Sequence, residues 1–286
     1  MTSSFGSRLA AEFAAGRHLC AGIDPHASLL VEWGLSDDAA GAERFGRAVV
    51  AAAAGVAAVV KPQVSFFERF GSAGFAALER VLADAREAGL LVIADAKRGD
   101  IGSTFDAYAE AWLAPGSPLE VDAMTAAPYM GLGTLSGAFP FVREHGKGLF
   151  LLAATSNPEA RAVQTAVGAD GRTIAATMVE SAADWNAREH ADDAVGSMGL
   201  VLGATLDLAD FGIDTAAKRA QALPVLAPGF GHQGARIEDV SRLFGELGRA
   251  VLASESRSIL AGGPSGLAAR IEARAAILTE ALTGSI

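Results

Sequence analysis

Cysteine is almost absent from this sequence. Cys20 is its one cysteine, so no disulfide can form within the chain, and we expect a reducing compartment, the cytoplasm. Long apolar runs are missing as well, because the run at 49–60 is too short and too rich in alanine and glycine to span a membrane. The first residues lack a secretory apolar region, so no targeting signal is expected.

Positive charge is also in short supply. The chain has 23 Lys and Arg against 33 Asp and Glu, a net charge of -10. Nucleic acids and anionic membranes are bound through clustered basic residues, so we expect neither as the main partner. Lysine is scarcest, and the chain contains only Lys61, Lys97, Lys147 and Lys218. Two of these end apolar segments, where a lysine, unlike an arginine, can serve as a proton donor.

Motifs for metals and dinucleotides are missing too. The five histidines, His18 and His232 among them, are scattered, and the sequence contains no zinc-ligand spacing and no glycine-rich dinucleotide fingerprint. No Gly-x-Ser-x-Gly elbow surrounds Ser156, which argues against a serine hydrolase. We therefore expect no metal site.

Eight short apolar segments bounded by breakers predict β-strands. They are 18–24, 57–63, 90–97, 120–126, 148–156, 199–205, 223–229 and 249–256. Between these segments, apolar residues recur every three or four positions, which predicts helices. We place the helices at 43–55, 75–89, 173–190 and 266–282. Strands alternating with helices form a parallel sheet, which is either closed as a barrel or open and doubly wound.

Polar residues at the strand ends favour the closed sheet. They are Asp24, Lys61, Asp95, Lys97, Ser156, Gln233 and Arg257. An open sheet gathers ligand groups at one switch point, whereas a barrel gathers them from its whole rim. We predict an α/β fold, a (β/α)8 TIM barrel, as a single domain over 1–286. The long connection at about 157–197 is predicted to add a short helix or lid at the mouth.

The third segment ends in a dense group of charges. In an extended strand, Asp95 and Lys97 point to the same face, which is the predicted barrel mouth. Asp100 is predicted to begin a helix, whose face it would share with Thr104. An isolated Asp-x-Lys pair is most often a solvated ion pair worth about 0–1 kcal/mol.

Two residues on the preceding strands favour a functional site over a solvated pair. Lys61 and Asp24 end those strands, so acidic and basic groups alternate along the rim. Such an array is costly to assemble without a ligand, and charges in a cleft are typical of functional sites.

The run from Asp95 to Thr104, DAKRGDIGST, resembles the signature of the orotidine 5′-monophosphate decarboxylase family, especially its longer bacterial branch, type 2. The other residues that match the family, in order, are Asp24, Lys61, Ser156 in ATSNP, Gln233 in APGFGHQG and Arg257 in SESRSI. The Asp-x-Lys-x-x-Asp core also occurs in sugar-phosphate relatives, so Ile101, Thr104 and the later motifs carry the discrimination.

The resemblance implies loss of CO2 from C6 of orotidine 5′-monophosphate, giving uridine 5′-monophosphate in de novo pyrimidine biosynthesis, without metal or organic cofactor. The C6 carbanion has no adjacent carbonyl to delocalise it, so placed cations must stabilise it. Lys97 is the candidate for this role and for protonating C6. Asp95 would lie beside the departing carboxylate, either destabilising the ground state or positioning the lysine. Lys61 and Asp24 would bind the ribose and orient Lys97, while Asp100 balances its charge.

The resemblance also assigns the remaining substrate contacts. Gln233, the glycines around it and Arg257 would bind phosphate, since the last two strands of a barrel often carry a phosphate site. Ser156 would recognise the pyrimidine edge, helped by Asn157, and Pro228 would line the ring pocket. Two features depart from the family pattern, namely Ser256, where a glycine is usual, and the length of the connection at 157–197.

In this family the residues matching Asp100, Ile101 and Thr104 enter the neighbouring subunit's site, which implies a homodimer. Three alternatives stay open. A metal-dependent sugar-phosphate enzyme of the same superfamily would hold magnesium on the shared carboxylates. A Schiff-base aldolase would use Lys97 as a nucleophile. A nucleotide-binding barrel without activity is the third alternative, although it has little use for a lysine flanked by carboxylates.

Overall fold

The computed structural model describes residues 3–283, and its core is a closed parallel barrel. The strands pair in sequence order, and β1 pairs with β8. They are β1 (Leu19–Ile23), β2 (Val59–Pro62), β3 (Leu91–Arg98), β4 (Ala123–Ala126), β5 (Gly148–Ala154), β6 (Met198–Leu202), β7 (Val225–Pro228) and β8 (Val251–Glu255). Each predicted segment overlaps one of these strands, so the predicted (β/α)8 barrel is confirmed.

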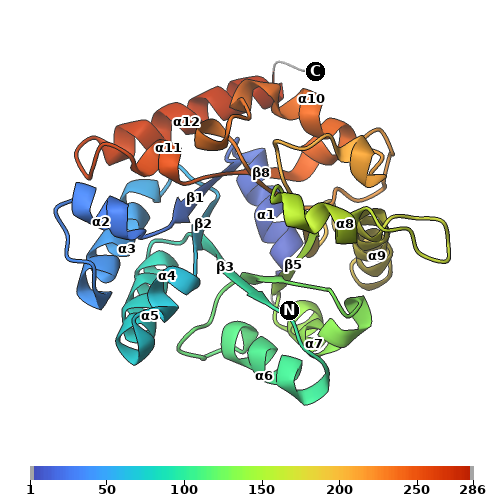
Figure 1. The fold of residues 1–286 in the computed structure, drawn as a ribbon, viewed down its shortest axis with the longest axis horizontal. Helices are drawn as coiled ribbons and strands as arrows, with labels where there is room; N and C mark the ends of the chain where they lie inside the picture. Colours follow the sequence, from blue (N-terminus) through green and yellow to red (C-terminus); the bar gives the residue numbers. More distant parts are fainter. Residues whose placement is uncertain (1–2, 284–286) are drawn as a thin grey trace.

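Helices surround the strands (Figure 1). The long ones are α1 (Phe5–Ala14), α3 (Ala39–Ala53), α5 (Gly71–Glu87), α6 (Gly102–Leu113), α9 (Ile174–Glu189) and α12 (Leu267–Thr283). Shorter α-helices are α2 (Ala27–Glu32), α4 (Ser65–Glu68), α7 (Phe139–Glu144), α8 (Arg161–Gln164), α10 (Val240–Phe244) and α11 (Arg257–Leu260). The 3-10 turns are η1 (Leu132–Ala138), η2 (Pro158–Ala160), η3 (Leu208–Phe211), η4 (Gly231–Gln233), η5 (Ile237–Asp239) and η6 (Gly245–Ala250).

The four helices predicted from apolar spacing are α3, α5, α9 and α12. Two begin earlier than predicted. α3 begins at Ala39 because the Asp38 side chain caps it by accepting a hydrogen bond from the Gly41 N–H. α5 begins at Gly71, where a positive φ of 62° turns the chain into the helix. The spacing of apolar residues, from which these helices were predicted, does not reveal where a cap or a glycine turn begins the helix.

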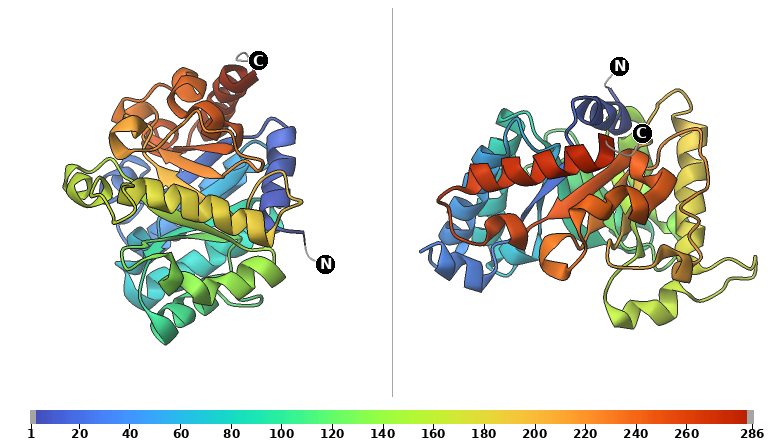
Figure 2. Two further views of the ribbon diagram at one scale, coloured as in Figure 1. Left: turned by 90° about the vertical axis from the view of Figure 1, so that its right-hand side faces the viewer. Right: turned by 90° about the horizontal axis from the view of Figure 1, so that it is seen from above.

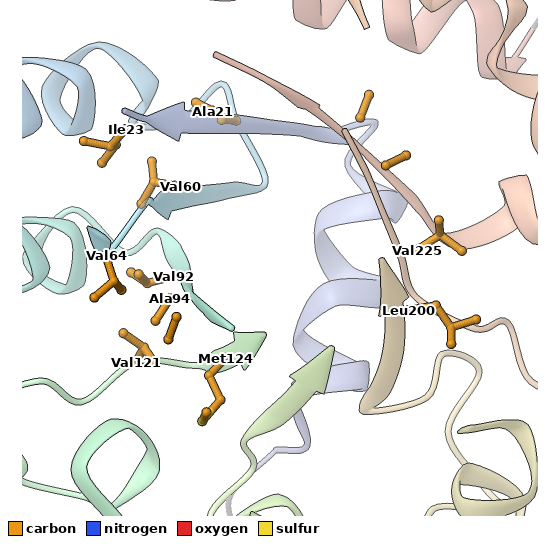
Figure 3. Close-up of a cluster of buried hydrophobic side chains, with 14 of the residues drawn as sticks. Ala21, Ile23, Val60, Val64, Val92, Ala94, Val121, Met124, Leu200 and Val225 are labelled. Atoms are coloured by element: carbon orange, nitrogen blue, oxygen red, sulfur yellow. The ribbon is translucent and has the colours of Figure 1, made fainter. Parts of the chain in front are cut away.

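The barrel strands are buried on both faces, which explains their continuous apolar runs. One face packs against the surrounding helices, and Figure 3 shows part of this layer, with side chains of Ile23, Val60, Val92 and Met124 directed away from the barrel interior. The alternate residues fill the interior. At about 1.5–3 kcal/mol for each large apolar side chain, this double burial is the main source of stability.

Helix α1 closes one end of the barrel. Phe5 is fully buried there, and its ring meets Phe150 edge-on with 5.9 Å between centroids. The two rings belong to an interior cluster that includes Val59 and Ile93. In Figure 1 α1 is seen through the ring of strands, and in the right view of Figure 2 it lies at one end of the molecule. The opposite end, where the strands finish, stays open for ligands.

No helix among residues 3–283 is both long and apolar enough to cross a membrane.

Candidate active site

A cavity of about 390 Å³ opens where the strands end. Most of the residues singled out from the sequence line it: Asp24, Lys61, Asp95, Lys97, Ser156, Pro228, Gln233 and Arg257. They meet because β1, β2, β3, β5, β7 and β8 all finish at this edge of the barrel.

Asp95 is the centre of a charge network inside the cavity. The residue is 8% exposed, and its carboxylate accepts from two lysines, with Lys61 Nζ 2.8 Å from Oδ2 and Lys97 Nζ 2.5 Å from Oδ1. The Thr125 hydroxyl also donates to Oδ1 at 3.0 Å. Lys97 Nζ donates to Gln63 Oε1 at 3.4 Å as well. Asp95 and Lys61 face the interior because they continue the inward set of Ile93 and Val59.

The two lysines keep Asp95 ionised. Burial alone would raise the pKa of this carboxyl, but Lys61 and Lys97 hold it well below its usual range. Burial would lower the pKa of Lys61, but the carboxylates of Asp95 and Asp24 raise it above its ordinary value. Asp95 and Lys61 are therefore both charged although they are shielded from water, whereas the Lys97 side chain is 45% exposed.

Lys97 has an unusual backbone. Its φ is 49°, which makes it the one non-glycine residue in the left-handed region among residues 3–283. The β3–β4 register shifts between Ala94 and Arg98, and the Lys97 N–H donates to the Thr125 hydroxyl at 2.9 Å. Lys97 lies within β3 and lines the cavity with Asp95, as predicted, but its backbone is not extended, because the irregular β3–β4 register turns this residue. Its ammonium still reaches Asp95, at a backbone cost of about 1–3 kcal/mol.

Asp24 and His26 form the wall next to β1. Asp24 Oδ1 is buried and has no hydrogen-bond partner within residues 3–283, so it is available to a ligand. The His26 ring packs on Phe66, with centroids 4.1 Å apart. Burial lowers the pKa of His26. The Asp24 carboxylate raises this pKa, whereas Arg257 and Arg69 lower it further. His26 therefore tends to be neutral.

The loop after β7 and the start of α11 after β8 form a second wall of the cavity, close to β1 because β8 pairs with both β7 and β1. Gly229, Gly231 and Gly234 have φ values of 122°, 68° and 103°, which other residues adopt at a cost. These turns bring His232 and Gln233 to the cavity, while Arg257 reaches it from the start of α11. A side-chain amide and a guanidinium on one wall suit an anion.

Ser256, where the family usually has glycine, has a φ of -131° and so does not require glycine. Its side chain packs against β1. A Cβ on Gly22 would lie 2.8 Å from Ser256 Cβ, so Gly22 makes the room that Ser256 needs. The Ser256 hydroxyl is buried and unpartnered within residues 3–283.

The end of β5 supplies the polar edge of the cavity. Ser156, Asn157 and Thr155 line it. Gln164 at the end of α8 fixes this segment by accepting from the Thr155 N–H and donating to the Thr155 hydroxyl, both at 2.9 Å. A short helix of the 157–197 connection is thus tied to the cavity wall. Movement of this helix as a lid stays a prediction.

Asp100, Ile101 and Thr104 do not line the cavity of their own chain. Ile101 is 58% exposed, and the Asp100 carboxylate accepts from the Ile101 N–H at 2.8 Å. α6 begins at Gly102, so the predicted helical face shared by Asp100 and Thr104 is wrong. Within one chain, the expected contact of Asp100 with Lys97 is not formed.

The polar residues of the site that were missed from the sequence include His26, Gln63, Thr125 and His232. Strand periodicity could have found Thr125, because it lies two residues after the inward-facing Ala123. Gln63 could have been found in the same way, because it lies two residues after the inward-facing Lys61. Among residues 3–283, no three His, Cys, Asp or Glu side chains are grouped as metal ligands.

The closed barrel and its charged mouth define the class: a (β/α)8-barrel protein whose candidate ligand site is the cavity at the carboxyl ends of the strands. A model of the orotidine 5′-phosphate decarboxylase / HUMPS family matches residues 17–269. The chain belongs to this family.

Individual proteins agree with the family match. The chain is 52% identical over 272 residues to orotidine 5′-phosphate decarboxylase of Streptomyces coelicolor, covering 94% of both chains. It is 49% identical to the enzyme of that name from Salinispora arenicola, covering 99% of both. The crystal structure of a Streptomyces avermitilis protein assigned the same activity superposes with a TM-score of 0.91 at 49% identity, covering 99% of this chain and 97% of the other.

Proposed function

We propose that this chain converts orotidine 5′-monophosphate to uridine 5′-monophosphate and CO2 in pyrimidine biosynthesis, with Lys97 as the proton donor. One observation carries the assignment of Lys97. Its ammonium is held 2.5 Å from the buried Asp95 carboxylate at a cavity that also has an anion-binding wall. The similar enzymes named for this reaction support the choice of substrate.

In the proposed reaction the bond between C6 and the carboxylate breaks, CO2 leaves, and the electron pair stays on C6. The Lys97 ammonium stabilises this carbanion and then transfers a proton to C6, becoming a neutral amine that solvent reprotonates. A cation held in place before the reaction stabilises the transition state without a reorganisation cost. The network around Asp95 supports this role.

Asp95 supports two roles in the proposal. As an ionised, buried carboxylate it would repel the substrate carboxylate and so destabilise the ground state. As the shared partner of Lys61 and Lys97 it also positions both ammonium groups. Positioning is the role that the hydrogen bonds of this structure support directly.

The other contacts of the nucleotide follow from the cavity walls. We assign the ribose hydroxyls to Asp24 and Lys61, because Asp24 Oδ1 is free to accept. Phosphate is assigned to Gln233 and Arg257, which line the cavity after β7 and β8. The pyrimidine edge and ring are assigned to the Ser156 and Pro228 positions, which line the same cavity. Binding energy from the remote phosphate can then be used at the reacting ring.

We further propose a homodimer in which Asp100, Ile101 and Thr104 enter the partner's site. Their absence from their own cavity supports this assignment. Exposed apolar side chains on the same side support it too, since Ile101 is 58% exposed, and Tyr129 and Met130, after the neighbouring strand, are 83% and 47% exposed. Surfaces of this kind are typical of interfaces. The dimer would also bring a second carboxylate, Asp100, to Lys97.

We propose one barrel domain, no cofactor and a cytoplasmic location. The single, buried Cys20 fits a reducing compartment, and burial raises the pKa of its thiol to about 12, which makes it unreactive.

The test is an assay of purified protein with orotidine 5′-monophosphate and a chelator, following ultraviolet absorbance and released CO2. We expect full turnover with the chelator, and loss of turnover in Lys97→Ala. Lys218→Ala is the matched control, because Lys218 is exposed and does not line the cavity. Chelator-sensitive turnover of a sugar phosphate, with no reaction of the nucleotide, would instead favour the metal-dependent relatives.

A further inference from the structure

Thr125 on β4 lies at the centre of the charge network but does not line the cavity. Its residue exposure is 0%, so it cannot contact a bound nucleotide. Any influence of Thr125 on the reaction must therefore act through its neighbours.

The single hydroxyl of Thr125 connects two parts of Lys97's surroundings. It donates to Asp95 Oδ1 at 3.0 Å, and it accepts from the Lys97 N–H at 2.9 Å. A hydroxyl has one proton to donate, so donation to Asp95 leaves its lone pairs for the Lys97 amide. Asp95 Oδ1 is also the atom that holds Lys97 Nζ. Thr125 thus binds one end of Lys97 directly and the other through Asp95.

The backbone of Lys97 needs such a restraint. A non-glycine residue keeps a left-handed conformation only where its surroundings impose it. On the far side of Lys97, the Ala127 N–H donates to the Arg98 carbonyl at 2.8 Å, which resumes the pairing of β3 with β4. Between Ala94 and Arg98 the regular register is interrupted, and the Thr125 side chain takes the Lys97 N–H that the shifted strand pairing leaves.

We propose that Thr125 is a positioning residue for the decarboxylation, keeping the Lys97 backbone left-handed and turning Asp95 toward the Lys97 ammonium. This inference rests on the proposed function, in which Lys97 protonates C6. Loss of the hydroxyl frees the Lys97 backbone and rotates its partner carboxylate, so the ammonium moves away from the reacting carbon. Nucleotide affinity is unaffected, because Thr125 does not reach the ligand.

The kinetic test compares Thr125→Val, which replaces the hydroxyl by a methyl group, with Thr125→Ser, which keeps it. A displacement of about 1 Å can cost about 100-fold in rate, and we expect a fall of about this size in kcat for Thr125→Val. Affinity for uridine 5′-monophosphate should stay unchanged, and Thr125→Ser should recover most of kcat. Thr279→Val is the control, since Thr279 lies on α12 and its hydroxyl contacts the backbone carbonyls of Gly16 and Ala275, not the charge network. A Thr125→Val enzyme with normal kcat, or one that loses nucleotide affinity in parallel with kcat, would refute the positioning role.

A second test does not depend on activity. The chain has only four lysines, so 15N-lysine labelling gives a simple amide spectrum, in which Lys97 is identified by the signal missing from Lys97→Arg. We expect Thr125→Val to shift the Lys97 amide proton upfield, as its hydrogen bond is lost, while the Lys147 and Lys218 signals stay in place. An unchanged Lys97 signal contradicts the inference. If the protein fails to decarboxylate the nucleotide but the Lys97 signal shifts, the proposed function is wrong and the contact stands.

Discussion

Lys61 and Asp95 form an ion pair inside the barrel, with Lys61 Nζ 2.8 Å from Asp95 Oδ2 and the side chains 7% and 10% exposed. Removing one partner of a buried pair costs about 3–5 kcal/mol where the remaining charge is uncompensated, and here Lys97 and Asp24 offset part of that cost. Urea unfolding should therefore show strong destabilisation in Lys61→Met and in Asp95→Asn.

The double variant Lys61→Met/Asp95→Asn is the informative control, because it removes both charges together. We expect its loss of stability to be smaller than the sum of the two single losses, since residues in contact are coupled. Additive losses would mean that the pair contributes little to folding.

Stability should also depend on the ionisation of Asp95. Its two lysines hold the pKa below its usual range against the opposing effect of burial, so the unfolded chain binds the proton more tightly than the folded protein does. The stabilisation is thus complete above the unfolded pKa of about 3.9 and decreases as pH falls further. The Tm difference between the native chain and Asp95→Asn should be constant from neutral pH to about pH 5 and shrink below about pH 4. A difference that persists unchanged to pH 3 would contradict this.

The left-handed backbone of Lys97 leads to an unusual stability order. At φ 49°, glycine avoids a cost of about 1–2 kcal/mol that any other residue bears, so Lys97→Gly should unfold at higher urea than Lys97→Ala. Both variants should be inactive. Lys61 is the matched comparison, because its φ is not positive, and there the alanine variant should be the more stable. The same order at both positions would argue against strain at Lys97.

Arg257 should act on catalysis through the phosphate. We expect Arg257→Ala to reduce kcat/KM for orotidine 5′-monophosphate by about 100-fold, the size of an effect of about 2–3 kcal/mol from a charged hydrogen bond. The same change should have no effect with orotidine, which has no phosphate. Arg236→Ala is the control, since Arg236 has a 73% exposed side chain and does not line the cavity. An equal loss with both substrates would remove Arg257 from the phosphate site.

Subunit mixing tests the shared site. Lys97→Ala and Asp100→Ala should each be inactive as pure proteins, but in a heterodimer one of the two sites contains both native residues. Random exchange at equal amounts should restore about a quarter of the native activity, because half the dimers are mixed and half their sites are intact. Light scattering should show a dimer throughout. An active monomer, or no recovery after exchange, would exclude the shared site.

Much of the candidate site was predictable because a parallel barrel brings all strand ends to one edge. A polar residue that ends an apolar segment must then lie at the mouth, which correctly grouped Asp24, Lys61, Ser156 and Arg257. Asp100 escaped this rule because it lies beyond the strand, where the chain has already turned toward α6.

The sequence by itself determined the alternation of strands and helices and the charged rim of the barrel. Both follow from local patterns, since strands buried on two faces read as apolar runs and amphipathic helices repeat every three to four residues. Only the tertiary structure decided which charges pair, that Lys97 is left-handed, and that Thr125 holds it. These contacts join residues 28, 30 and 34 positions apart, and their geometry depends on the β3–β4 register, which local periodicity does not specify.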